Sequence, residues 1–299
     1  MFDNIRAFHQ PTSAQEALRL LAGKEGKACL VAGGTDLALR AGRSVEVLVD
    51  LSRLGLSYIK RKGGGLRIGA TTTMAVLEES VLVRLMADGI LAKAASSCGS
   101  PQTRNMATIG GNLANASPAA DTATPLLAMD AEVALQGLRS SRRLPLEKFF
   151  SGPHATLGNH ELLVEIAVPP CKANSAFSFQ RLARTEVDIA IVTVAAAIRW
   201  NVAQRCTGVR LALGAVAPCP MRSRRAEALL EGRAATEKLI MKVAEIVSED
   251  IAPISDVRAS AEYRREISQV LVRRALQECI QRLENESSNG TADHNGGSR

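Results

Sequence analysis

Two Gly-Gly pairs, each placed directly before hydrogen-bonding side chains, restrict the folds open to this chain more than any other feature. The first lies in residues 28–37, where the apolar run Ala-Cys-Leu-Val-Ala leads into Gly33-Gly34-Thr35-Asp36. This pattern predicts a short strand, a tight turn and the start of a helix. Glycines let backbone N–H groups approach a ligand closely, and the N-terminal amides of a helix capped by Thr35 or Asp36 attract a phosphate. Taken alone, such a segment is more often an ordinary tight turn.

The second pair, Gly110-Gly111, lies in residues 105–121 between Thr-Ile and Asn. Further along, Ser117-Pro118 predicts a helix start, because serine is a favoured N-cap and proline is tolerated at the first helical position. Asp121 then falls in the first turn, where its carboxylate either complements the helix dipole or accepts hydrogen bonds from a ribose or ribityl hydroxyl. Two separate glycine segments, one for each phosphate of a diphosphate, are much less expected by chance than one.

Neither glycine segment matches the usual nucleotide-binding fingerprints. The sequence has no Gly-x-Gly-x-x-Gly and no Gly-x4-Gly-Lys-Ser/Thr, which argues against a Rossmann domain and against a P-loop. A large dinucleotide lying between two subdomains, with its diphosphate between the two Gly-Gly turns, suits FAD.

On these residues the chain resembles the FAD-binding (medium) flavoprotein subunit of the molybdenum hydroxylases, the family of carbon monoxide dehydrogenase and xanthine dehydrogenase. The resemblance begins with residues 32–37 (Ala-Gly-Gly-Thr-Asp-Leu) and 108–112 (Thr-Ile-Gly-Gly-Asn). It continues, in the same order along the chain, through the segments 117–121, 161–166, 184–190 and 258–265. It therefore covers nearly the whole chain, from residue 1 to about residue 284.

The resemblance implies an α+β fold: a two-subdomain FAD-binding domain of the vanillyl-alcohol-oxidase/xanthine-dehydrogenase type, followed by a smaller C-terminal α+β domain. The first subdomain is expected to be a small parallel α/β unit and the second an antiparallel sheet with helices. A composition rich in Asn, Ser and Gly predicts that the end of the chain is disordered. The expected boundaries are 1–55 and 56–172 for the two FAD-binding subdomains, 176–284 for the C-terminal domain and 285–299 for the disordered tail.

Hydrophobic periodicity and turn residues give the expected elements. A helical crossover implies parallel pairing of the first two strands, and Gly63-Gly64-Gly65 predicts a hairpin between the next two. Thr73 is the expected N-cap of one helix. Residues 189–200 are compatible with a strand or with a buried helix, and the turn at 201–205 favours a hairpin. Strands are expected at 28–32, 45–50, 58–62, 66–69, 131–135, 161–168 and 209–216, and helices at 14–22, 35–41, 74–79, 81–97, 118–128, 222–231, 234–249 and 260–284.

The resemblance also implies how the cofactor is held. Backbone amides of residues 32–37 and 108–112, together with the Thr35 and Thr108 hydroxyls, are expected to bind the FAD diphosphate. Asp121 is expected to anchor sugar hydroxyls. No catalytic residue and no metal ligand of this chain is implied, which fits a protein whose cofactor supplies the chemistry.

Further contacts are implied beyond the glycine segments. Leu162 is expected to pack beside the flavin or the adenine, and Gln180 or Arg181 stands where family members often have a lysine that contacts the cofactor. Arg184 and Asp188 match family positions, but an ion pair within the chain explains them equally well. The candidate cofactor-binding residues are Leu30, Val31, Ala32, Gly33, Gly34, Thr35, Asp36, Leu37, Thr108, Gly110, Gly111, Asn112, Ser117, Asp121, Leu162 and Arg181.

Composition narrows the remaining function classes. No stretch approaches the ~20 apolar residues of a membrane span, and the acidic, h-region-free N-terminus does not read as a secretory signal, so we expect a cytoplasmic protein. The net charge of +7 is spread along the chain and only 3% of residues are aromatic, so no nucleic-acid partner is expected. The six cysteines show no Cys-x-x-Cys spacing, which predicts reduced thiols rather than an iron–sulfur or zinc site, with Cys98 the one nearest the ligand.

The implied function is that of one subunit in a larger complex. FAD in this chain is expected to take electrons from the [2Fe-2S] clusters of a small subunit and to pass them to NAD, a quinone or oxygen, while a large molybdopterin subunit oxidises the substrate. One alternative is a stand-alone FAD-dependent reductase of the peptidoglycan-precursor type, which needs its own substrate pocket and proton donor. A second alternative is a non-enzymatic nucleotide-binding or scaffold module.

Overall fold

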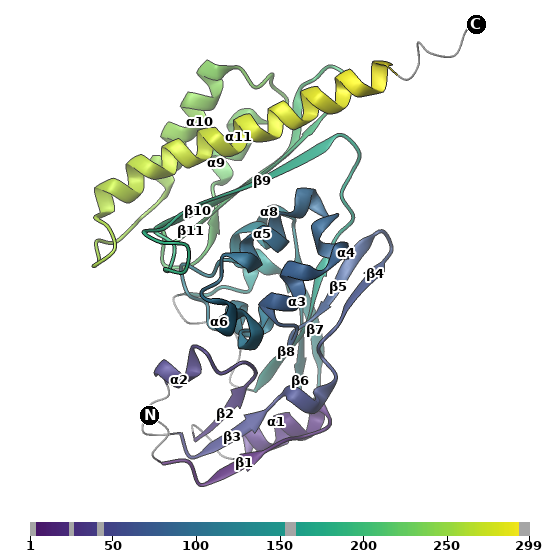
Figure 1. Cartoon of the computed structure of the whole chain (residues 1–299), viewed down its shortest axis with the longest axis vertical. Coiled ribbons are helices and arrows are strands. Elements are labelled where there is room, and N and C mark those ends of the chain that lie inside the picture. The colour runs from purple at the N-terminus through teal and green to yellow at the C-terminus, as the bar shows by residue number, and fades with distance from the viewer. Residues whose placement is uncertain (1–3, 24–26, 41–44, 153–159, 293–299) are drawn as a thin grey trace, which may run out of the picture.

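Three sheets, with helices between and around them, follow one another along the long axis of the molecule (Figure 1). The structure, a computed structural model, describes residues 4–23, 27–40, 45–152 and 160–292. None of the helices in these ranges has an apolar stretch of the length that a bilayer crossing needs.

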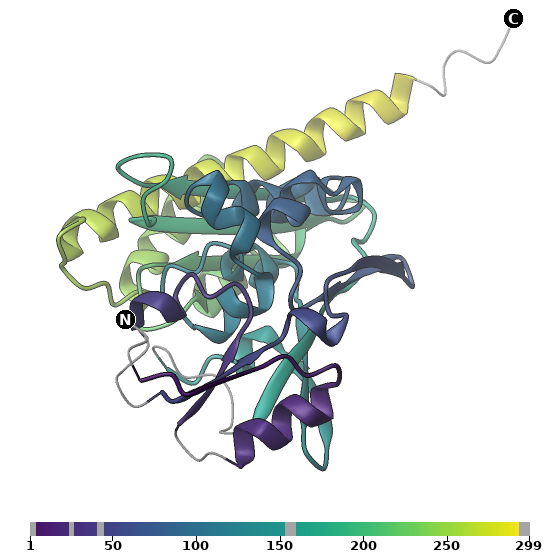
Figure 2. The same cartoon turned by 60° about the horizontal axis from the view of Figure 1, so that its bottom comes forward.

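The N-terminal unit is a parallel sheet in the order β1-β3-β2, formed by β1 (Ala7–His9), β2 (Ala28–Val31) and β3 (Val47–Asp50). Helix α1 (Ala14–Ala22) buries Ala17 and Leu18 in the same small core as Val47 and Val49. The predicted helix at 14–22 and the parallel pairing of the first two predicted strands are confirmed. After β2 the chain runs up to the short helix α2 (Leu37–Arg40), beside the helices of the next unit (Figure 2).

The middle unit contains a five-stranded antiparallel sheet in the order β4-β5-β8-β6-β7. Its strands are β4 (Ile59–Lys62), β5 (Gly65–Gly69), β6 (Glu132–Gly137), β7 (Ser141–Pro145) and β8 (Glu161–Val168). The predicted hairpin of β4 with β5 is confirmed. Strand β7 was not predicted, because it is an exposed edge strand with charged residues and so lacks the apolar alternation that marks a strand.

A layer of short helices covers this sheet: α3 (Met74–Glu79), α4 (Val81–Arg84), α5 (Ile90–Ser96), α6 (Pro101–Met106), α7 (Ile109–Ala114) and α8 (Ala123–Ala128). The Thr73 side chain accepts the N–H of Val76 and caps α3, as predicted. The single helix predicted at 81–97 is wrong. Asp88 and Gly89 have φ of 53° and 71°, and these left-handed residues break the segment into α4 and α5.

The helix predicted at 118–128 is also wrong at its start. Ser117 accepts the N–H of Ala119 in a local turn, and its neighbour Ala116 has a φ of 45°, so the chain turns twice before α8 begins at Ala123. Serine side chains compete with helix formation through such local bonds. The same Ser-Pro signature does begin a helix at Ser100-Pro101, the start of α6, which was not predicted.

The C-terminal unit is a four-stranded antiparallel sheet in the order β12-β11-β10-β9, covered by three helices. In the segment 189–200, which was left open between strand and helix, residues 192–200 form β10. This strand pairs with β11 across the turn at 201–205, which confirms the predicted hairpin. The elements are β9 (Ser175–Leu182), β10 (Val192–Trp200), β11 (Cys206–Gly214), β12 (Met221–Arg222), α9 (Arg224–Leu230), α10 (Glu237–Asp250) and α11 (Ala261–Ala292).

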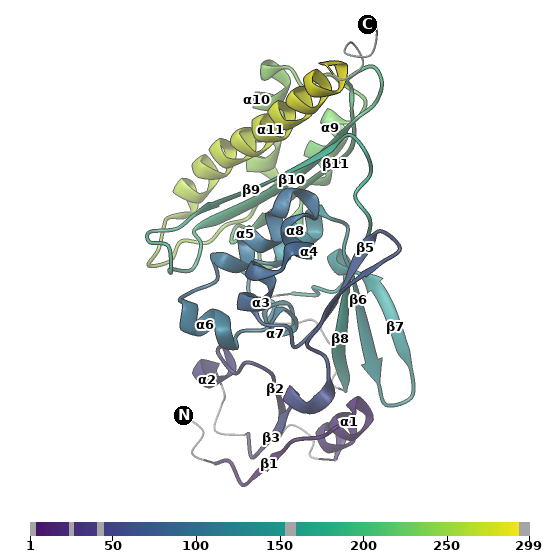
Figure 3. The ribbon, with the colours of Figure 1, turned by 45° about the vertical axis from the view of Figure 1, so that its right-hand side comes forward.

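The C-terminal sheet is buried on both faces (Figure 3). On one face Val192 and Val194 pack in the core formed with α9, α10 and α11, and on the other Phe179 and Ala195 belong to the core of the middle unit. Strands buried on both faces read as continuous apolar runs, which explains why β10 resembled a buried helix in the sequence. The helices of the middle unit therefore lie between the five-stranded sheet of that unit and the C-terminal sheet.

Helix α11 runs to Ala292 and so enters the tail that was predicted to be disordered from residue 285. The Ser287 and Ser288 hydroxyls donate to the carbonyls of Leu283 and Glu284, one helical turn back. Adding a residue to an existing helix needs no new nucleus, so the helix extends beyond its last buried side chain, Leu283. Residues 293–299 lie outside the described ranges.

Candidate cofactor site

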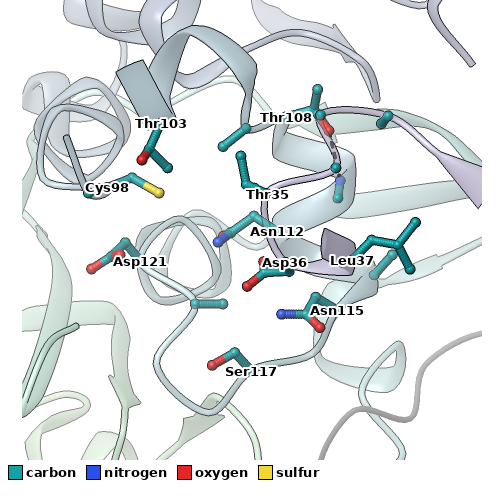
Figure 4. Close-up of a pocket in the computed structure, with 18 of the residues that line it drawn as sticks. Thr35, Asp36, Leu37, Cys98, Thr103, Thr108, Asn112, Asn115, Ser117 and Asp121 are labelled. Carbon is teal, nitrogen blue, oxygen red and sulfur yellow. Dashed lines mark hydrogen bonds between the residues drawn. The ribbon is translucent and has the colours of Figure 1, made fainter. Parts of the chain in front are cut away.

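A cavity of about 650 Å³ opens where the three units meet (Figure 4). Its walls come from residues 29–37 of the N-terminal unit, from the middle helices, and from residues 187–189 in the connection between β9 and β10. Three candidates, Gly110, Leu162 and Arg181, lie outside the lining. The candidates that line the cavity are Leu30, Val31, Ala32, Gly33, Gly34, Thr35, Asp36, Leu37, Thr108, Gly111, Asn112, Ser117 and Asp121.

Gly33 joins the N-terminal unit to the middle helices. A Cβ at this position would lie 1.9 Å from the carbonyl oxygen of Met106 and 3.0 Å from the Cα of Ala107. Gly34 follows with a φ of 70°, which glycine adopts without strain. The first glycine of the pair is therefore required by contact with protein backbone, and the second by the direction of the turn.

The segment Gly33-Gly34-Thr35-Asp36 carries four backbone amides that make no hydrogen bond within the described part of the chain. The next bond of this segment is the N–H of Ala38 donating to the Gly34 carbonyl, at 2.8 Å. All four residues line the cavity. Because consecutive amides of this kind bind anions, the segment is a ready site for a phosphate.

The second glycine segment uses its amides differently. The Ile109 and Gly110 amides donate to the carbonyls of Thr72 and Ala70, at 2.9 and 2.8 Å. The Thr108 hydroxyl and carbonyl accept the N–H groups of Gly111 and Asn112, at 3.1 and 2.9 Å. This segment is thus the capped first turn of α7, and the amides of residues 109–112, four of the five that were expected to hold a phosphate, are already bonded to the protein.

Gly110 lies behind the cavity wall for a packing reason. A Cβ there would lie 2.6 Å from both the Cβ and the carbonyl oxygen of Ala70. Helix α7 contributes the side chain of Asn112 to the cavity. Its Oδ1 accepts a hydrogen bond from the Thr122 hydroxyl at 2.6 Å, and its amide nitrogen points into the cavity (Figure 4).

Asp121 lies on the cavity wall as a buried carboxylate, 8% exposed, with the Arg181 Nε 3.1 Å from its Oδ1. Burial raises the pKa of Asp121 to about 6, although the Arg181 guanidinium opposes the shift. Arg181 also donates to the carbonyl of Asp188, so it joins the wall at Asp121 to the β9–β10 connection. Gln180, the other candidate at this position, donates to Glu278 on α11 and so faces away from the cavity.

One of the candidate residues lies away from the cavity, and two of the residues that line the cavity were not predicted. Leu162 is 2% exposed and packs in the core of the N-terminal unit, away from the cavity lining. Arg184 does pair with Asp188, at 3.2 Å. Val187 and Ile189, which line the cavity and are more than half exposed, were missed because only tertiary structure brings this connection to the glycine segments.

The thiols are not reactive groups here. All six cysteines are free, and Cys98 lines the cavity as expected, but Cys29, which was not singled out, lines it as well. Burial raises the pKa of Cys98 to about 12, so the side chain is a neutral thiol. Within the described residues, no three His, Cys, Asp or Glu side chains lie close enough together to hold a metal ion.

Two known protein families match successive parts of the chain. Residues 2–171 match the family model described as the FAD binding domain in molybdopterin dehydrogenase, and residues 177–279 match the CO dehydrogenase flavoprotein C-terminal domain. The chain is 32% identical over 289 residues to the xanthine dehydrogenase FAD-binding subunit of Escherichia coli O157:H7, a match that covers 94% of this chain and 97% of that protein.

Two solved structures agree with this result. Carbon monoxide dehydrogenase from Hydrogenophaga pseudoflava matches with a TM-score of 0.90 and 33% identity, covering 94% of this chain and 99% of the matched chain. Quinoline 2-oxidoreductase from Pseudomonas putida 86 matches with a TM-score of 0.85 and 28% identity, covering 95% of this chain and 99% of the matched chain.

Fold and cavity therefore define a flavoprotein with an FAD-binding domain and a flavoprotein C-terminal domain. The chain belongs to the FAD-binding subunits of the molybdenum hydroxylases, the family that contains the carbon monoxide and xanthine dehydrogenases, and its cofactor is FAD. The resemblance read from the glycine segments, the α+β fold class and the identification as an oxidoreductase subunit are confirmed.

Proposed function

We propose that this chain is the electron-transfer subunit of a molybdenum hydroxylase complex, in which FAD bound in the 650 Å³ cavity receives electrons from a [2Fe-2S] partner subunit and passes them to a separate acceptor. When bound, FAD supplies a redox centre that exchanges electrons singly or in pairs. The observation that carries the proposal is the set of four amides at Gly33-Gly34-Thr35-Asp36, which have no hydrogen bond to any described residue and lie on the wall of a cavity that both domains share.

The residues present fit FAD. The cavity lies within the range of about 300–1,000 Å³ that is usual for cofactor sites. The amides of 33–36 bind the diphosphate, and the buried carboxylate of Asp121 accepts hydrogen bonds from sugar hydroxyls. Leu30, Val31 and Ile189 offer apolar surface to the ring systems. In this arrangement the protein binds, orients and shields the cofactor, while the redox chemistry belongs to the flavin.

The relatives indicate what kind of assembly this chain enters. One is the medium chain of a carbon monoxide dehydrogenase and another is the medium subunit of a nicotine 6-hydroxylase, so both are parts of larger enzymes. By analogy, the partners of this chain are a large molybdopterin subunit and a small [2Fe-2S] subunit, and the acceptor is NAD, a quinone or oxygen. A cytoplasmic location stays a prediction.

Exposed apolar side chains beside the cavity favour a partner there. Met106, next to the lining residue Ala107, is 56% exposed, and Val187 and Ile189 are 56% and 52% exposed. Apolar side chains exposed next to a functional site offer contact area to a partner protein.

The test uses the complex purified through a tag on this chain from its native host. We expect FAD, iron and molybdenum in the same particle, and flavin reduction when the substrate of the complex is added. The variant Gly33→Ala, which places a Cβ against the Met106 carbonyl, is expected to remove FAD while iron and molybdenum remain and are still reduced. Full flavin content in this variant, or a complex without iron and molybdenum, contradicts the proposal.

The stand-alone reductase is distinguished by the chain purified alone and loaded with FAD. Steady oxidation of NADH together with reduction of a small substrate, without any partner subunit, favours that alternative. A yellow protein that holds FAD but turns over only when a reduced iron–sulfur partner is added favours the electron-transfer subunit.

A further inference from the structure

The segment 258–265, which the sequence analysis marked without giving it a role, leads into α11 and is hydrogen-bonded to Asp256 just before it. The carboxylate of Asp256 accepts the backbone N–H groups of Arg258 and Ala259, at 2.8 and 3.3 Å, and Nη2 of Arg264, at 2.8 Å. Although burial acts to raise it, these donors lower the pKa of Asp256 to about 2. Asp256 therefore stays ionised and fixes the direction of the Arg264 side chain.

Arg264 reaches from this fixed start into the interior. It is 3% exposed, and its Nη1 donates to two carbonyls, those of Ile191 at 2.5 Å and Ala215 at 3.1 Å. Ile191 lies two residues after the cavity residue Ile189, at the end of the β9–β10 connection.

The second carbonyl leads to the opposite wall of the cavity. Ala215 has a φ of 65°, a left-handed conformation that a non-glycine residue keeps only when its surroundings hold it there. Its N–H donates to the Pro118 carbonyl at 2.6 Å, within the loop that carries Ser117 and Asp121. The Arg264 side chain is thus connected to both walls of the cavity, through Ile191 on one side and through Ala215 on the other.

Arg181 makes a parallel connection. Its Nε lies 3.1 Å from the Asp121 carboxylate, and its Nη2 donates to the Asp188 carbonyl. The β9–β10 connection and the loop at 117–121 are therefore held together twice, each time through one guanidinium. A guanidinium presents its donors in a fixed planar fork, which suits it to bind acceptors from two different segments, and a lysine ammonium does not reproduce this.

We propose that Arg264, together with Arg181, positions the two walls of the cavity, so that the C-terminal domain sets how long FAD stays bound. Arg264 does not line the cavity and acts through Ile191 and Ala215. The inference rests on the proposed use of this cavity for FAD.

The experiment compares Arg264→Lys with a matched control, Arg222→Lys, in the full-length, FAD-loaded protein. Arg222 is buried to the same degree, with a side chain 3% exposed, and also joins the C-terminal domain to the middle unit, but it does so through Asp130 and Glu227. We expect Arg264→Lys to release FAD about tenfold faster, measured as the recovery of flavin fluorescence on dilution. Arg222→Lys is expected to lower the melting temperature and to leave the release rate within about twofold of wild type.

Hydrogen exchange in the FAD-free proteins supplies the second readout. Arg264→Lys is expected to speed exchange of the amides at 183–191 and 117–121, and trypsin cleavage after Arg184, whose side chain is 54% exposed. Unchanged exchange at both segments overturns the inference, and so does an equal gain in FAD release rate for Arg222→Lys. If FAD fails to protect the amides of 33–36 in the wild type, the proposed function is at fault instead, and that result is independent of Arg264.

Discussion

Two segments of similar sequence, 33–36 and 108–112, line the same cavity from different units and use their backbones in opposite ways. In both, one glycine is required because protein backbone lies where its Cβ would be: the Met106 carbonyl for Gly33 and Ala70 for Gly110. The first segment leaves all four of its amides unbonded within the described residues, whereas in the second the amides of 109–112 donate to Thr72, to Ala70 and to the N-cap Thr108. A Gly-Gly pair therefore marks close packing in both places, and only in the first do we propose an anion site.

The largest effect is expected where the first segment contacts the middle unit. In Gly33→Ala the new Cβ meets backbone atoms at 1.9 and 2.6 Å, so the loop must move away from α6. We expect FAD affinity to fall by at least about 100-fold, measured by fluorescence titration, because the four amides proposed to bind the diphosphate are displaced. Gly23→Ala, whose Cβ meets only the Arg19 carbonyl at 3.3 Å, is the control. Unchanged affinity in Gly33→Ala would show that the loop is not the phosphate site.

The matching change in the second segment is expected to act on stability instead. In Gly110→Ala the Cβ falls 2.6 Å from Ala70 in the core of the middle unit, and such overpacking costs about 3 kcal/mol. Urea unfolding measures the loss, and Gly111→Ala, which meets only the Thr108 hydroxyl, is the smaller control. FAD affinity of the folded Gly110→Ala protein should stay near that of wild type. A large loss of FAD affinity without a loss of stability would mean that the second segment, like the first, binds the cofactor.

Elements with local signals were predictable from the sequence. Helix α1 and strand β8 have the predicted ends, and α3 begins after its predicted cap, Thr73. The break at Asp88 was not predictable, because its left-handed backbone depends on a partner that is distant in the sequence. The Asp88 carboxylate accepts the N–H of Phe177 at 2.7 Å. Ser100 and Ser117 also show that a local sequence signal is not sufficient. Both serines precede a proline, but only Ser100 caps a helix.

The candidate site was predictable where it is continuous in the sequence. Residues 30–37 were identified from their own pattern, and all of them line the cavity. The wall formed by Val187 and Ile189 was not predictable, because the neighbouring sequence does not distinguish these residues from ordinary loop positions. Arg181 contacts Asp121 and Gln180 contacts Glu278 on α11, because successive side chains of β9 point to opposite faces of the sheet. The sequence alone could not show which side chain faces the cavity, because it does not reveal what packs on each face.

A third expected effect concerns the loop that follows the second segment. Because burial raises the pKa of Asp121 to about 6, its carboxyl becomes protonated as the pH falls through that value. A neutral carboxyl accepts hydroxyl bonds less strongly than a carboxylate, so FAD affinity should fall about tenfold between pH 7 and pH 5. Asp121→Asn should bind FAD weakly with little pH dependence over the same range. A wild-type profile as flat as that of the variant would remove Asp121 from the site.

The same pKa has an opposite consequence for folding. A carboxyl whose folded pKa lies above its unfolded value binds its proton more tightly in the native state. Its contribution is fully present below about pH 4 and is lost as the pH rises through about 6, so the FAD-free wild type should lose stability relative to Asp121→Asn across this window. Urea midpoints of the two proteins at pH 4.5 and pH 7 measure the difference, and a difference of the opposite sign contradicts the raised pKa.

A smaller effect separates capping from ligand binding at Thr108. Its hydroxyl accepts the Gly111 N–H at 3.1 Å, and loss of such a cap costs about 1 kcal/mol. We expect Thr108→Ala to lower the free energy of unfolding by that amount and to change FAD affinity less than about threefold, whereas Thr108→Ser should behave as wild type. A loss of affinity larger than the loss of stability would mean that the hydroxyl also contacts the cofactor.

The smallest effect tests how the first segment holds an anion. Among the described residues that line the cavity there are three carboxylates, Asp36, Asp121 and Asp188, and no lysine, arginine or histidine. A diphosphate bound by neutral amides and hydroxyls releases few counterions, and the long-range attraction from the net charge of +7 is opposed by these nearby carboxylates. FAD affinity should therefore change less than about threefold between 50 and 500 mM salt. A drop of tenfold or more would show that a cationic side chain, and not the backbone of 33–36, neutralises the phosphates.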